Sequence, residues 1–130
     1  THMYPFIILS AAILLAPSSV SATEWESLVK KADTELLVDL DSYDEKGAYS
    51  SILAKRETHG KQTIAKQTKL EFDCGKQIYR TLATATFDAK GKLLSQTAGM
   101  RDFQSLQHDE DAKMIAGLVC QVRRMVNPSS

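Results

Sequence analysis

Lys69-Leu70-Glu71-Phe72-Asp73-Cys74-Gly75 is the stretch of sequence that decides the fold. Leu70, Phe72 and Cys74 take one side of a β-strand, and the acidic residues between them take the other side. The only other cysteine, Cys120, lies in the last helical pattern of the chain. A bond between the two cysteines would therefore tie a strand in mid-chain to a terminal helix.

The first residues have the pattern of a secretory signal peptide. The apolar run from Phe6 to Ala16 has the length of a signal-peptide core and is shorter than the roughly 20 residues of a membrane span. Val20-Ser21-Ala22 predicts cleavage after residue 22, hence a signal peptide over residues 3–22. A retained anchor or buried helix is the alternative. Residues 1–2 are interpreted as an expression scar.

We therefore expect an exported protein, located in the periplasm, on the outer surface or secreted, with no membrane span after cleavage. Its single domain would cover residues 23–130, which is small enough to benefit from a covalent link. Export permits a disulfide, and two cysteines allow one intramolecular pair. A loop of this length gives about 4 kcal/mol as an upper value for the stabilisation. Two free, buried thiols are the alternative.

Alternating patterns predict an antiparallel sheet. Strands are expected over residues 35–41, 48–58, 62–74, 77–88 and 93–97, and a turn over 42–47. Residues 23–31 fit a first strand or a short helix, and we favour the strand. Short glycine-containing turns between the strands imply that neighbours are antiparallel. Lys66 and Thr68 interrupt the apolar face of their strand, which places them past the edge of the core.

The last part of the chain predicts one helix. Asp109-Glu110-Asp111 suits a helix N-terminus. Apolar residues then recur at i, i+3, i+4 and i+7 from Ala112 to Val126, and Asn127-Pro128 ends the pattern. The predicted fold is therefore α+β: an antiparallel β-sheet of about five to six strands, with a C-terminal helix packed on one face and one disulfide.

Residues typical of catalysis are few. His59 falls in a turn and His108 in a polar connection, where a surface histidine is the simpler interpretation. The sequence contains neither a Gly-x-Ser-x-Gly elbow nor a glycine-rich phosphate loop. Asp39, Asp41 and Asp44 lack the spacing of an EF-hand loop. We therefore expect no enzymatic activity, no cofactor and no metal site.

Basic residues are the more suggestive feature. They gather in the central predicted strands and turns as Lys55, Arg56, Lys66, Lys69, Lys76 and Arg80. On one side of the sheet they would form a basic stripe for a polyanion or an extracellular protein. Glu57, Glu71 and Asp73 lie among them, so a mixed, solvated face is the alternative. Lys plus Arg and Asp plus Glu number 16 each, and this zero net charge argues against a nucleic-acid partner.

Four segments together resemble the bacterial surface-adhesin E-like proteins. They are Val38-Asp39-Leu40-Asp41-Ser42, Leu70-Glu71-Phe72-Asp73-Cys74, Ile78-Tyr79-Arg80 and Val119-Cys120. The resemblance runs from about Trp25 to Cys120. Phe103 and Gln107-His108-Asp109 stand where the family tends to carry a tryptophan and a Pro-Gly-Ser segment.

The resemblance implies one antiparallel sheet with a C-terminal helix held by a Cys74–Cys120 disulfide. It implies export to the periplasm or outer surface and, for adhesive members, contact with host extracellular-matrix or plasma proteins of the laminin, vitronectin or plasminogen type. Some members pair as homodimers. The expected function is thus an exported adhesin-like binding protein. The alternative is a periplasmic binding or inhibitor module with a bacterial or host-enzyme target.

Overall fold

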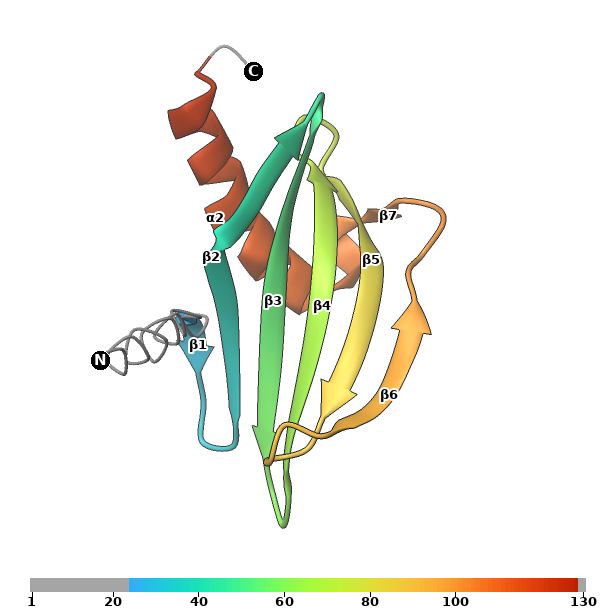
Figure 1. Cartoon of the computed structure of the whole chain (residues 1–130). Coiled ribbons are helices and arrows are strands. Elements are labelled where there is room, and N and C mark those ends of the chain that lie inside the picture. Colours follow the sequence, from blue (N-terminus) through green and yellow to red (C-terminus); the bar gives the residue numbers. More distant parts are fainter. Residues whose placement is uncertain (1–23, 129–130) are drawn as a thin grey trace, which may run out of the picture.

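Seven strands, counted over the residues 24–128 that the structure describes, form one antiparallel sheet in this computed structural model (Figure 1). The first six lie side by side in chain order as β1 (Glu26–Lys30), β2 (Thr34–Lys46), β3 (Tyr49–His59), β4 (Thr63–Asp73), β5 (Ile78–Phe87) and β6 (Leu93–Ala98). The chain then continues through β7 (Gln104–Ser105), which pairs with β5, the 3-10 turn η2 (Leu106–His108) and the helix α2 (Glu110–Val126). The predicted α+β fold is confirmed, and β1 is the strand favoured for its segment.

β2 is longer than predicted, because it continues through the turn expected at residues 42–47. After Asp39 its register with β3 shifts, which marks a β-bulge. Ser42 holds the bulge, since its hydroxyl donates to the carbonyl of Asp39 (2.6 Å) and accepts from the N–H of Leu53 (2.8 Å). The turn is confined to the tip of the hairpin, where Gly47 has a positive φ of 59°. The prediction of a six-residue turn was therefore wrong.

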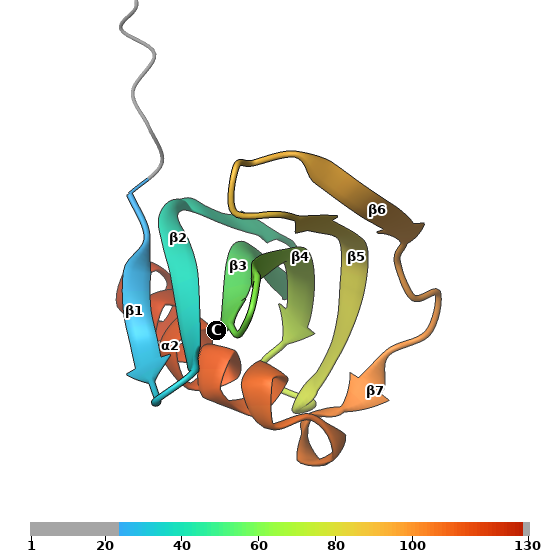
Figure 2. The same cartoon turned by 90° about the horizontal axis from the view of Figure 1, so that it is seen from below.

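The hydrophobic core lies between α2 and one face of the curved sheet, along whose side the helix runs in Figure 2. The sheet contributes alternate buried side chains: Leu36, Val38, Ile52, Leu70, Phe72 and Tyr79. The helix contributes its apolar stripe: Ala112, Ile115, Ala116 and Val119. Phe72 is fully enclosed, so the stretch from Lys69 to Gly75 supplies the centre of the core.

The helix covers only part of this face, because the lower ends of β3 and β4 extend beyond it in Figure 1. The side chains of β4 become polar there, with Lys66 exposed and Thr68 partly buried. This is the interruption seen in the sequence pattern. A hollow remains between this part of the sheet and the first turn of α2.

Both ends of α2 agree with the prediction of an acidic first turn and an end at Asn127. The carboxylate of Asp109 accepts a hydrogen bond from the N–H of Ala112 (3.0 Å), which satisfies one free donor of the first turn. Glu110 and Asp111 follow in that turn, where the helix dipole favours negative charge. At the other end Asn127 donates its N–H to the carbonyl of Arg123 (2.8 Å).

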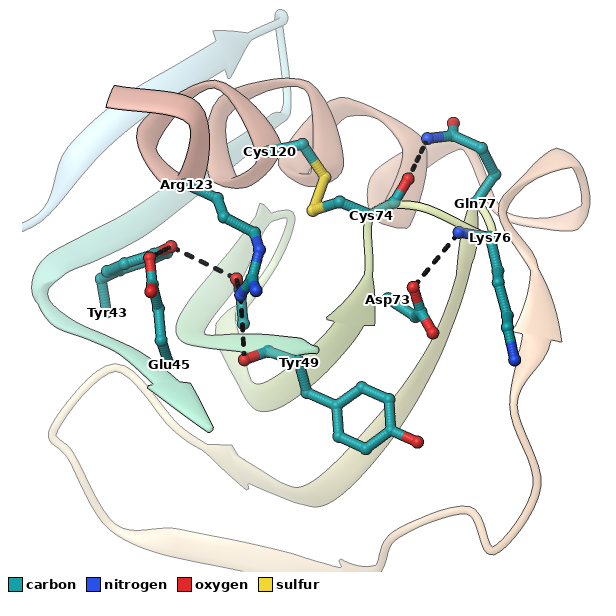
Figure 3. Close-up of a disulfide and its surroundings, with 10 residues drawn as sticks. Tyr43, Glu45, Tyr49, Asp73, Cys74, Lys76, Gln77, Cys120 and Arg123 are labelled. Atoms are coloured by element: carbon teal, nitrogen blue, oxygen red, sulfur yellow. Dashed lines mark hydrogen bonds between the residues drawn. A yellow bond between two sulfur atoms is a disulfide. The ribbon is translucent and has the colours of Figure 1, made fainter. Parts of the chain in front are cut away.

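The predicted disulfide is present. Cys74, directly after β4, is bonded to Cys120 in α2 (Figure 3). The Cα atoms lie 5.7 Å apart, inside the usual range of roughly 4.4–6.8 Å. The bond therefore links the end of a central strand to the helix, 46 positions further along the chain.

Several predictions concern residues 1–23, which lie outside the described part of the chain. These are the expression scar, the signal peptide and its cleavage site. Between residues 24 and 128, no helix has the length and apolar character needed to cross a membrane.

Candidate functional site

The sheet divides the six predicted basic residues between its two faces. Arg56 pairs with Lys66, and both point to the side that carries α2. Lys55, Lys69 and Arg80 point to the opposite side. We call that side the open face, and its central residues are Tyr49, Leu53, Lys55, Lys69, Glu71 and Arg80. Because side chains alternate along a strand, neighbours such as Lys55 and Arg56 cannot share a face.

Lys76 lies apart from both groups, in the turn between β4 and β5. Its N–H donates to the carboxylate of Asp73 (3.2 Å), as Figure 3 shows. The structure thus brings three of the six basic residues together on the open face. Their role in binding stays a prediction.

Arg80 is the most firmly held cation of the open face. Its Nε donates to Glu71 Oε1 (2.9 Å), and its Nη1 donates to the carbonyl of Arg101 (3.0 Å). The guanidinium also lies 4.5 Å from the ring centre of Phe103, which in turn packs 5.1 Å from the ring of Tyr49. The result is a fixed cluster of two aromatic rings and one ion pair.

Lys55 occupies a similar setting on the other side of the open face. Its Nζ lies 4.3 Å from the ring centre of Trp25 and 3.3 Å from Glu57 Oε2. Only 14% of its side chain is exposed. Lys69 lies between the two clusters, and it forms no ion pair within residues 24–128.

The open face therefore has a mixed charge, and two of its three cations are neutralised by carboxylates. Such a surface provides little long-range attraction for a polyanion. It does present partly exposed tryptophan, tyrosine and arginine side chains, the types most often found at the energetic centre of protein interfaces. Sequence reasoning found the basic residues and did not place Trp25, Tyr49 or Phe103 beside them. Phe103 was noted only for its place in the family resemblance, because it lies in a segment without periodicity and no local signal marked its contacts.

A second candidate is the hollow below the first turn of α2. It has a volume of about 250 Å³, and its floor is formed by the apolar residues Leu36, Ala54, Leu70, Ala112 and Ile115. Its rim is polar, with Arg56, Lys66, Thr68, Thr81, Thr84, Asp109 and Asp111. This volume falls slightly below the roughly 300–1,000 Å³ typical of small-molecule pockets. The hollow could accept a small group, such as one side chain of a partner.

Both acidic residues at the rim already have hydrogen-bond partners within the protein. Arg56 forms a two-point ion pair with Asp111, with Nε 2.6 Å from Oδ2, and this bond raises the pKa of the guanidinium. Tyr79 donates its hydroxyl to Asp109 (3.1 Å). Burial, and then the charge of Asp109, raises the pKa of Tyr79. Lys66 is the one rim cation without an ion pair in the described chain.

A third polar cluster surrounds the disulfide (Figure 3). Arg123 is buried, and its guanidinium donates to the carbonyl of Gly47 (2.8 Å) and to Ser50 Oγ (3.0 Å). Tyr43 donates to Glu45 Oε2 (2.6 Å), and burial, followed by that bond, raises its pKa. The guanidinium joins the end of α2 to the β2–β3 hairpin. We interpret these contacts as stabilising the fold, because all the groups face other parts of the protein.

The two histidines within residues 24–128 lie at the surface. His59 contacts Thr63 Oγ1 (3.3 Å), and its Nε2 lies 3.7 Å from Glu57. His108 is exposed in η2. No group of three or more His, Cys, Asp or Glu residues within 24–128 is arranged to hold a metal ion.

A scan against models of protein families, a search of curated proteins and a search of solved structures each found no match to this chain. The surface-adhesin E-like resemblance therefore stays a prediction.

Proposed function

We propose that the protein is an exported adhesin-like binding protein that contacts host extracellular-matrix or plasma proteins through its open face. The observation that supports this proposal best is the pair of aromatic and cationic clusters on that face. Arg80 is fixed against Phe103, and Lys55 is fixed against Trp25. Side chains held in place before binding lose little conformational entropy when a partner docks.

The class of partner rests on the family resemblance, which implies proteins of the laminin, vitronectin or plasminogen type. Association would depend on short-range contacts, because the charges of Arg80 and Lys55 are matched by Glu71 and Glu57. Lys69 would supply the one unpaired charge at the centre of the contact. Self-association as a homodimer, also implied by the resemblance, would be a separate property.

The experiment compares two lysines of the same strand. Immobilised protein is exposed to laminin, vitronectin and plasminogen at physiological salt, and binding is measured for wild type, Lys69→Glu and Lys66→Glu. Lys69 lies on the open face, whereas Lys66 lies on the helix side. We expect saturable binding that Lys69→Glu weakens by about tenfold or more, since it places a like charge beside Glu71. Lys66→Glu should bind as the wild type does.

Absence of saturable binding to all three proteins would refute the adhesin proposal. Equal effects of the two substitutions would show that net charge matters and the open face does not. Thermal unfolding of both variants provides the check on folding.

The hollow beside α2 supports a second candidate, a periplasmic binding or inhibitor module. In that case a partner side chain would enter the hollow and meet its apolar floor, with Lys66 and the threonines at the rim. Thr68→Trp would then fill the hollow and prevent binding, and Lys69→Glu would have no effect. The two variants thus distinguish the two functions.

A further inference from the structure

The two outer strands of the sheet differ in their protection against further pairing. β1 has five residues and is charged at both ends by Glu26 and Lys30. β6 has six residues, none of them charged, and every one is exposed. Leu93 and Leu94 expose 46% and 50% of their surface. Short, charged edges resist the addition of a strand, and uncharged edges permit it.

The backbone of β6 offers hydrogen-bonding groups on its outer side. The N–H of Met100 donates to the carbonyl of Thr81 on β5 (2.7 Å), but the β5–β6 pairing ends at Ala98 and does not extend to Gly99. Ala98 therefore exchanges no hydrogen bonds with its partner Ala83, and the next pair, Thr97 and Thr84, does, because the two kinds of pair alternate along an antiparallel ladder. The N–H of Thr97 thus points toward β5, and those of Gln96 and Ala98 point outward. Within residues 24–128, no strand pairs with this outer side.

β6 is also held firmly on β5. A Cβ atom at Gly99 would lie 2.2 Å from the carbonyl oxygen of Thr81, so only glycine allows the two backbones to approach this closely. The edge is therefore in place before any partner arrives, which reduces the entropy lost on binding.

We propose that β6 binds an extended segment of a partner protein by antiparallel strand addition. The outward backbone groups of Gln96 and Ala98 would form the hydrogen bonds, and these specify an extended chain as the occupant. Apolar side chains of the segment would contact Leu93 and Leu94. This surface is separate from the open face, and the proposal does not depend on the function proposed above.

The positive charges of the β5–β6 turn indicate the composition of the segment. An antiparallel segment places its C-terminal end beside the β5–β6 turn, which contains Lys90 and Lys92. The carboxylate of Asp88 in this turn already accepts the backbone N–H groups of both lysines (2.9 Å each). An uncharged segment with an acidic residue near its C-terminal end is therefore the complementary ligand.

A second copy of this chain fits the edge less well. The β5–β6 register shifts between Thr86 and Phe87, so regular pairing is limited to Ser95–Ala98. Two rigid edges in contact over so short a stretch would bury far less than the roughly 1,200–2,000 Å² of a stable interface. A flexible segment can follow the bulge and continue along the exposed leucines.

The test uses random peptides displayed on phage and selected on the immobilised protein. We expect enriched peptides with alternating β-branched residues and an acidic residue near the C-terminal end. Gln96→Pro removes one outward N–H and should weaken a selected peptide by about tenfold. Gln96→Val retains that N–H and should bind normally. Lys69→Glu should also bind normally, which separates this test from that of the open face.

Methylation of the peptide backbone gives a second readout that needs no protein variant. N-methyl groups at alternate positions should abolish binding, and those at the intervening positions should be tolerated. Failure to select any peptide that shows this alternation would overturn the proposal. So would normal binding by a folded Gln96→Pro variant. A wild-type dimer in sedimentation velocity that becomes monomeric in Gln96→Pro would assign the edge to a second copy and also overturn it.

Discussion

The two faces of the sheet are built from the same strands but are held by different kinds of contact. On β4, Leu70 and Phe72 point into the core below α2, whereas Lys69 and Glu71 point to the open face. The helix side is apolar and is closed by a disulfide, so its contacts stabilise the fold. The open face is held by ion pairs and aromatic contacts, which are individually weak in water but fix side chains at a surface. We therefore expect that stability and the proposed binding by the open face can be changed separately.

The largest difference between the faces is expected from adjacent truncations on β4. Phe72→Ala should lower the free energy of unfolding by about 3–5 kcal/mol, because it removes a fully buried ring from the core. Lys69→Ala, on the open face, should change it by less than about 0.5 kcal/mol. Urea denaturation of both variants measures the difference. Similar losses would mean that the open face also carries much of the stability.

Removal of the disulfide tests whether the helix side stabilises the protein without contributing to binding. Replacement of Cys74 and Cys120 by serine should cost about 2–4 kcal/mol, because the unfolded chain gains freedom. Thermal unfolding with and without reducing agent gives the same comparison in the wild type. Binding by the open face should persist below the melting temperature. An unchanged melting temperature under reducing conditions would contradict the expected role of the bond.

Arg123 provides an intermediate effect. Arg123→Met should cost about 1–3 kcal/mol, because it leaves the carbonyl of Gly47 and the hydroxyl of Ser50 without a donor. Arg124→Met is the matched control, since Arg124 is exposed in the same turn of α2. Chemical denaturation of the two variants makes the comparison. Equal stabilities of the two variants would show that the hydrogen bonds of the buried guanidinium add nothing to the stability.

The smallest expected effect is a dependence on alkaline pH. Burial and the charge of Asp109 raise the pKa of Tyr79 above its ordinary value of 10.0, so the folded state holds this proton more tightly than the unfolded state. The resulting stability is complete below pH 10 and is lost as pH rises through the folded pKa. Tyr79→Phe should therefore lose less stability than the wild type between about pH 9 and about pH 11. Parallel losses in the two proteins would contradict this.

Local patterns in the sequence determined the strands, the helix and the cysteine bond. Alternation around Phe72, the apolar stripe of α2 and its acidic start are properties of neighbouring residues, and two cysteines leave one possible pair. The separation of Lys55 from Arg56 also follows from alternation along a strand. It could have been predicted from their adjacent positions, and the expectation of one basic stripe ignored it.

Only the tertiary structure decided which distant side chains meet. Arg80 and Phe103 approach because β5 runs beside the connection to η2, and Arg56 meets Asp111 because the start of α2 lies over β3. Likewise, the hydroxyl of Ser42 extends β2 through an expected turn by bonding to Leu53 on the next strand. Such contacts depend on register and on the placement of the helix, to which many weak interactions contribute together. Residue type and local spacing do not identify which distant residues become partners.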